Sequence, residues 1–234
     1  MQIILLGVWA ILLFGGAIFG GGQAGREGRM PLWTRLGSSL ALVLFAWALW
    51  LSSGESESAG FTLLLAVGMT LGFIGDLFMA EVLPVRAYVF GGIAAFGLGH
   101  IAYIIAALSE GSRSGIAWDG GRITALTGGW VFAALAWWEI VSRPAKRRTA
   151  LHWAALPYAL LLGTTAGIGI GLSFSDGRFL SLAFGGILFL ISDLILAARL
   201  FNNLTFRRVD DVIWLTFGPA QALIVLTGWL SLAV

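Results

Sequence analysis

Eight long apolar runs follow one another along the chain, separated by short polar connections. The runs cover residues 3–22, 33–51, 61–80, 87–108, 122–141, 150–172, 179–200 and 212–232. Each is close to the ~20 apolar residues that an α-helix needs to cross the hydrocarbon core of a bilayer. The pattern therefore predicts an all-α fold, a polytopic membrane helix bundle with about eight transmembrane helices.

The connections are short, and several contain residues that break helices or carry charge. Residues 52–60 form an acidic loop, residues 110–121 a loop rich in glycine and serine, residues 142–149 a basic turn, and residues 201–211 the last loop. No stretch has the composition of a soluble domain or of a disordered tail. We therefore expect one integral membrane domain over residues 1–234.

The composition agrees with a membrane protein and limits the chemistry. Apolar residues make up 59% of the chain and charged residues 11%, whereas soluble domains contain about 25% charged residues. The chain has no cysteine and only two histidines, His100 and His152. Disulfides, thiolate chemistry and a histidine-rich metal site are thereby excluded. We expect no cofactor, no metal, and no nucleic acid as a partner.

The positive charges are distributed unevenly between alternate connections. Eleven of the 14 Lys and Arg residues, Arg26 among them, fall on one side of the predicted bundle, and Arg113, Arg122 and Arg178 fall on the other. Cytoplasmic loops of membrane proteins carry an excess of Lys and Arg. We therefore expect the basic loops in the cytoplasm, both termini outside, and a multi-pass protein of the plasma (inner) membrane.

Two of the predicted helices carry a carboxylate in an otherwise apolar segment, Asp76 in the third and Asp193 in the seventh. A charged side chain inside a spanning helix costs at least ~2.5–3.5 kcal/mol on insertion scales, so such residues face protein or water and have a function there. At 1.5 Å per residue, both lie in the inner half of the membrane, as do Tyr158 and Gln221. We predict that the two carboxylates face one pocket.

Structural roles for these residues remain open at this stage. Asp76 could meet water at a helix end, and Asp193 could pair with an arginine, although Arg199 is not at i+3 or i+4 from it. Tyr158 and Gln221 could form hydrogen bonds that hold neighbouring helices together.

The same polar residues suit more than one function. Two carboxylates in a low-dielectric cavity differ in proton affinity, which provides a general acid and a general base. They also suit a proton-coupled transporter, and the similar GDL and SDL segments around Asp76 and Asp193 allow a parallel duplication of four helices. A metal-assisted hydrolase would need His100 with both aspartates, and no ligand pair at i,i+3 or i,i+4 spacing supports it.

Four short motifs follow one another along the chain: Gly75-Asp76, Gly99-His100 with Tyr103, Ser192-Asp193 with Ala197, and Ala220-Gln221. Their order resembles that of the YhhN family, a group of lysoplasmalogenase-like membrane proteins. The resemblance extends over nearly the whole chain. One departure is Met30-Pro31-Leu32, where the family often has Lys-Pro-Leu. Arg29 or Arg35 would have to supply the missing charge.

The resemblance implies hydrolysis of the vinyl ether bond of a lysoplasmalogen, which yields a fatty aldehyde and glycerophosphoethanolamine or glycerophosphocholine. The implied catalytic residues are Asp76 and Asp193. The residues expected to contact substrate are His100, Tyr103, Tyr158, Ser192, Arg199 and Gln221. The expected partners are a lysophospholipid substrate and the lipid bilayer. The alternative is a proton-coupled small transporter or lipid-binding membrane protein that uses the same aspartates, and the sequence leaves the oligomeric state open.

Overall fold

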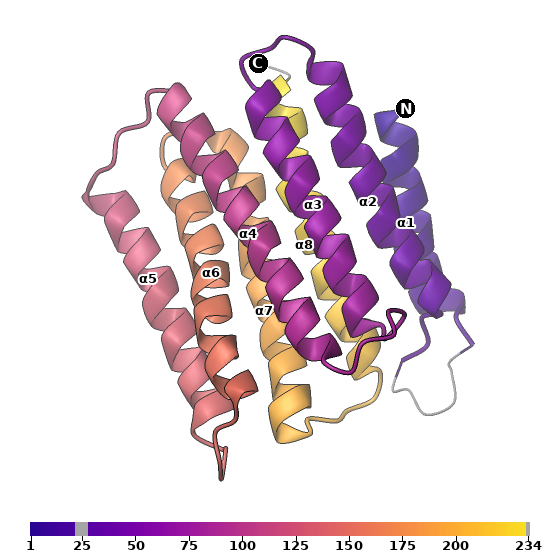
Figure 1. Ribbon diagram of the computed structural model, residues 1–234. Coiled ribbons are helices and arrows are strands. Elements are labelled where there is room, and N and C mark those ends of the chain that lie inside the picture. The colour runs from indigo at the N-terminus through magenta and orange to yellow at the C-terminus, as the bar shows by residue number, and fades with distance from the viewer. Residues whose placement is uncertain (22–27, 233–234) are drawn as a thin grey trace.

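The computed structural model describes residues 1–21 and 28–232, and this part of the chain folds as a bundle of helices without strands (Figure 1). Eight of its helices are long and apolar enough to cross a membrane by length and composition, which confirms the predicted bundle. The helices are α1 Gln2–Phe19, α2 Leu32–Ser53, α3 Ala59–Met79, α4 Tyr88–Arg113, α5 Gly120–Trp137, α6 Ala150–Ser173, α7 Leu180–Asn202 and α8 Val209–Leu232. A π-helical turn, η1 Trp138–Ser142, continues α5, and a 3₁₀ turn, η2 Gly177–Phe179, precedes α7.

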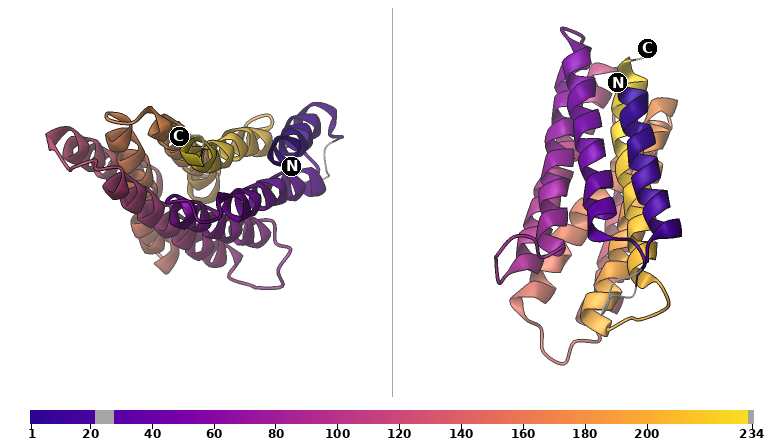
Figure 2. Two further views of the ribbon diagram at one scale, coloured as in Figure 1. Left: turned by 90° about the horizontal axis from the view of Figure 1, so that it is seen from above. Right: turned by 90° about the vertical axis from the view of Figure 1, so that its right-hand side faces the viewer.

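The helices differ in how much of their surface is buried. Viewed from above, α7 and α8 lie opposite α2, α3 and α4, and α1 and α5 lie at the two ends of the bundle (Figure 2). Only 11% of the most apolar window of α1 and of α5 is buried, against 44–56% in the other six. The two outer helices therefore present most of their apolar side chains outward, as lipid-facing helices do.

Helix α1 begins and helix α8 ends at the same end of the bundle, as an even number of spans requires (Figure 1). The connections α1–α2, α3–α4, α5–α6 and α7–α8 lie at the opposite end, which we call the basic end. These connections hold most of the Lys and Arg residues; Arg26 lies outside the described residues. The cytoplasmic location of the basic end stays a prediction.

Glycines allow the helices that carry the polar residues to approach one another closely. A Cβ on Gly163 of α6 would lie 2.5 Å from the backbone oxygen of Gly129 of α5. A Cβ on Gly169 would lie 2.8 Å from the backbone nitrogen of Ala183 of α7, and one on Gly185 would lie 2.9 Å from the backbone oxygen of Ala220 of α8. Small residues at membrane helix contacts permit this packing, which places α5 to α8 side by side.

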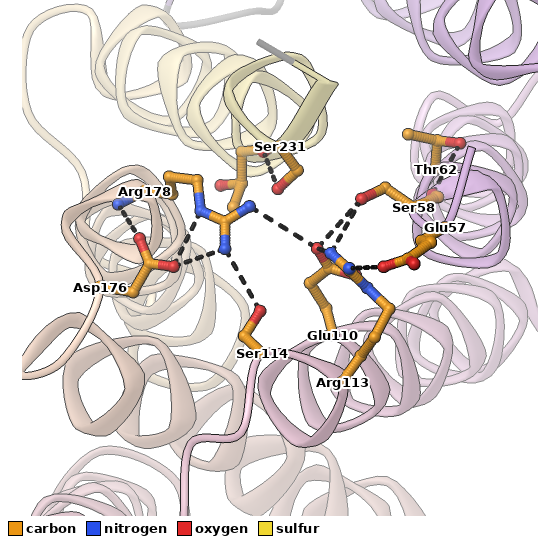
Figure 3. Close-up of polar contacts among 10 residues, drawn as sticks. Glu57, Ser58, Thr62, Glu110, Arg113, Ser114, Asp176, Arg178 and Ser231 are labelled. Carbon is orange, nitrogen blue, oxygen red and sulfur yellow. Dashed lines mark hydrogen bonds and ion pairs between the residues drawn. The ribbon is translucent and has the colours of Figure 1, made fainter. Parts of the chain in front are cut away.

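The expected loop at residues 110–121 is wrong at its start, because α4 continues to Arg113. Glu110 is only 2% exposed, and it accepts hydrogen bonds from Ser58 Oγ at 3.1 Å and from Arg113 Nε at 2.9 Å (Figure 3). Arg178 of η2 approaches the same carboxylate to 3.8 Å. This network of tertiary contacts stabilises the last turn of α4 although its glycine and serine content is typical of a loop.

The network also ties together connections that are far apart in the sequence. Arg113 reaches Glu57 in the α2–α3 connection at 2.8 Å. Arg178 pairs with Asp176 at 2.5 Å. The side chain and the backbone N–H of Arg178 both donate hydrogen bonds to the Asp176 carboxylate, and these hydrogen bonds lower its pKa. The network therefore links the α2–α3 connection, α4 and η2 at the end of the bundle opposite the basic end.

We expect Glu110→Gln to destabilise the protein by about 1–3 kcal/mol, because an amide cannot satisfy two guanidinium groups at a buried position. The measurement is thermal unfolding in detergent. The matched control is Glu139→Gln, since Glu139 forms an exposed i,i+4 pair with Arg143 and such pairs contribute ~0.3–0.5 kcal/mol. Equal losses in the two variants would contradict a special role for the buried network.

Candidate active site

A pocket of about 320 Å³ lies between α2, α3, α4, α7 and α8 near the basic end, and Asp76 and Asp193 both line it. The two carboxylates come from helices on opposite sides of the bundle (Figure 2). Ser192 and Arg199 of α7 also line this pocket. Four of the residues selected from the sequence thus meet at one place.

Asp76 lies in the last turn of α3 and is only 3% exposed. The hydroxyl of Ser39, on α2, donates a hydrogen bond to Asp76 Oδ2. Ser39 Oγ also lies 3.4 Å from Gln221 Oε1, and both side chains are buried. A Cβ on Gly72 would lie 3.2 Å from Gln221 Nε2, so the small residue on α3 leaves room for the amide. Asp76, Ser39 and Gln221 form a buried polar cluster across three helices.

Asp193 has a different hydrogen-bond partner from Asp76, namely a tyrosine hydroxyl. The Tyr158 hydroxyl of α6 donates a hydrogen bond to Asp193 Oδ2. Arg199, which follows on the same helix, pairs instead with Asp210 of α8 at 2.7 Å. The sequence left open a pairing of Asp193 with a nearby arginine, and Arg199, the arginine considered there, pairs with Asp210 instead.

Positive charge reaches the pocket from two helices. Arg35 of α2 is buried, lines the pocket, and lies with its guanidinium carbon 5.6 Å from the ring centroid of Trp214. Arg199 lines the pocket from α7. Guanidinium groups bind phosphate with paired hydrogen bonds. Because Arg199 pairs with Asp210, Arg35 is the guanidinium that suits the α2 side of the pocket to an anionic group.

His100 and Tyr103 lie on α4 but are not among the residues that line the pocket. The His100 Nδ1 atom lies 2.8 Å from Thr165 Oγ1, and the Tyr103 hydroxyl contacts the Met69 sulfur at 2.9 Å. A Cβ on Gly68 would lie 2.2 Å from the Tyr103 ring, so this ring fills space left by a glycine. Contact of His100 and Tyr103 with substrate stays a prediction.

A narrow apolar groove of about 70 Å³ lies beside the pocket, between α4, α5, η1, α6 and α7. Its lining is apolar apart from Tyr158 and Asp193. The groove and the pocket have five lining residues in common, namely Met79, Phe96, Asp193, Leu196 and Leu200. The pocket and the apolar groove therefore meet at Asp193.

Sequence reasoning did not assign Ser39, and it weighed Arg35 only as an alternative to Arg29. Positions 35 and 39 are four residues apart, so they share one face of α2, and this spacing is the signal that could have found them. Arg29 lines a different pocket. Among residues 1–21 and 28–232, no group of three or more His, Asp or Glu side chains is arranged to hold a metal ion.

A comparison with models of protein families identifies one family that covers the pocket. A model described as the YhhN family matches residues 32–228, which is most of the chain and includes the residues that line the pocket around Asp76 and Asp193. No curated protein and no solved structure matches the chain.

Proposed function

The chain belongs to the YhhN family, and from this premise and the geometry of the pocket we propose that it is a membrane-embedded lipid hydrolase. Its substrate in this proposal is a lysoplasmalogen, whose vinyl ether bond is cleaved to give a fatty aldehyde and glycerophosphoethanolamine or glycerophosphocholine. The observation that carries the proposal is the junction at Asp193, where a pocket with two carboxylates meets an apolar groove.

The linings of the two spaces, one apolar and one charged, support a lipid with one chain. The alkenyl chain lies in the narrow groove, and the glycerophosphate lies in the polar pocket. Arg35 lines that pocket and binds the phosphate through charge-assisted hydrogen bonds. The vinyl ether, which joins chain to glycerol, then lies at the junction beside Asp193.

The chemistry needs a proton donor and a negative charge. A carboxylic acid protonates the β carbon of the vinyl ether, which gives an oxocarbenium ion and leaves a carboxylate. Water adds to this ion and gives one proton back to the carboxylate, which restores the acid, and the resulting hemiacetal collapses to aldehyde and alcohol. The β carbon lies on the chain side of the ether oxygen. Asp193 lines both the groove and the pocket, so we assign it as the acid. Asp76, held by Ser39, is the ionised group that stabilises the cation, as in glycoside hydrolysis.

The test compares two lysolipids that differ in one double bond. Purified protein with EDTA present is expected to release aldehyde from the vinyl ether lipid and to leave its saturated alkyl ether analogue intact, because only the vinyl ether is cleaved after protonation at carbon. Mass spectrometry measures both products. Substrate-dependent proton flux in liposomes without any product would contradict the proposal and support a transporter.

We expect Ala159→Phe to discriminate against long chains, because Ala159 of α6 lines the groove and a larger side chain there overpacks it. The expected result is about a 10- to 100-fold fall in kcat/KM for a long-chain substrate, with a much smaller fall for a short-chain one. Steady-state kinetics over a chain-length series measures this. Ala154→Phe, on the same helix but away from the groove lining, is the control; equal effects of both variants would contradict the chain position.

A further inference from the structure

A second pocket of about 520 Å³ lies at the basic end, where the α1–α2 and α7–α8 connections meet. It has no lining residue in common with the candidate active site. Its lining consists of Gly28, Arg29, Thr205, Phe206, Arg207 and Arg208. Three of these six residues are arginines from two connections that are far apart in the sequence.

A buried carboxylate holds together the two connections that form this pocket. Asp211, in the first turn of α8, accepts hydrogen bonds from the backbone N–H of Arg29, at 2.9 Å to each oxygen, and from that of Met30 at 3.0 Å. A Cβ on Gly28 would lie 2.8 Å from Asp211 Oδ1 and 2.8 Å from Asp210 Cβ. The close approach therefore requires glycine, and it holds Arg29 beside the arginines of the other connection.

Among the residues that the structure describes, the two acids next to the pocket, Asp210 and Asp211, are engaged elsewhere. Asp210 pairs with Arg199, and Asp211 is occupied by backbone N–H groups. In the described part of the chain, the Arg207 and Arg208 side chains have no hydrogen bond or ion pair. Arg208 also has a φ of 66°, a left-handed conformation that costs a non-glycine residue of order 1–3 kcal/mol and clusters at ligand sites.

The chemistry of the lining indicates the ligand. Planar guanidinium groups bind phosphate oxygens in pairs, and the Thr205 hydroxyl is a further donor. Leu204 and Phe206 flank Thr205 and are 38% and 41% exposed, and exposed Leu and Phe side chains next to basic ones favour contact with an anionic lipid surface. Basic pockets between membrane helices bind anionic head groups.

We propose that this pocket binds the phosphate group of an anionic phospholipid. The exposed apolar residues beside the arginines favour a phosphate presented by a bilayer over one free in solution. The site is separate from the proposed hydrolytic centre, and its test does not depend on catalysis.

The experiment is native mass spectrometry of the full-length protein, purified in detergent and titrated with phosphatidylglycerol or phosphatidylcholine. Arg207→Gln/Arg208→Gln is expected to weaken phosphatidylglycerol binding about 10- to 30-fold, since each arginine near the surface contributes about 1 kcal/mol. Phosphatidylcholine binding is expected to stay weak in both proteins. Thermal unfolding of the variant in detergent checks that it remains folded.

The matched control is Lys146→Gln/Arg147→Gln, which removes the same charge from an exposed connection at the same end. Its binding of phosphatidylglycerol is expected to change less than about twofold. Unchanged binding in the Arg207/Arg208 variant, or an equal loss in the control, would overturn the proposal. Displacement of the lipid by millimolar inorganic phosphate would overturn the lipid source and assign the pocket to a soluble phosphate.

Discussion

Asp193→Asn is expected to lower the rate of aldehyde release from lysoplasmalogen by about 10²- to 10⁴-fold, the usual contribution of a positioned acid. The amide fills the same space at the junction of pocket and groove but has no acidic proton to transfer to the β carbon. Single-turnover kinetics with mass-spectrometric detection of the aldehyde measures the chemical step directly.

Asp76→Asn is expected to slow the same step, because the oxocarbenium ion loses the negative charge that stabilises it. The control is Glu81→Gln, which removes another carboxylate that lines the pocket from the α3–α4 connection. We expect that variant to keep its rate within about threefold. A Glu81 variant as slow as the aspartate variants would mean that net charge, and not position, matters.

Arg35→Gln is expected to lower kcat/KM for the lysolipid by about 10- to 100-fold, mainly through KM. Hydrogen bonds to a charged group contribute about 1.5–3 kcal/mol, and the buried Arg35 is the guanidinium that we place on the phosphate. Steady-state kinetics on a 1-alkenylglycerol without a phosphate provides the control, since the loss should nearly vanish there. A loss of equal size on both substrates would contradict phosphate binding and indicate a structural role beside Trp214.

The eight helices could be predicted from the sequence because membrane spans have a strong and simple signal. Runs of about 20 apolar residues have few alternatives, and each predicted run overlaps a helix. Helix ends were less predictable, because tertiary contacts decide them. The residues after Glu110 are rich in glycine and serine, and the contacts of the buried Glu110 with Arg113, Ser58 and Arg178 stabilise the last turn of α4.

The two carboxylates could also be selected from the sequence, because a charge in a spanning helix is expensive wherever the helix lies. Their partners could not be selected in the same way. The four-residue spacing of Arg35 and Ser39 puts both on one face of α2, but only the packing of α2 beside α3 and α8 brings that face to Asp76. The position of a residue along a helix does not say which way its side chain points. His100 lies on α4, which helps to form the pocket, but its ring contacts Thr165 and Phe189. The side of a helix that faces a pocket is a property of the assembled bundle.

The central claim is that Asp76 and Asp193 act together on one bond in one pocket. The most direct measurement is single-turnover aldehyde release by the wild type, Asp76→Asn, Asp193→Asn and the double variant. Residues that act as a unit are strongly non-additive, so we predict that the double variant is at most about threefold slower than the slower single variant. Two single variants with the wild-type rate, or a double variant whose loss is the product of the two single losses, would contradict the claim.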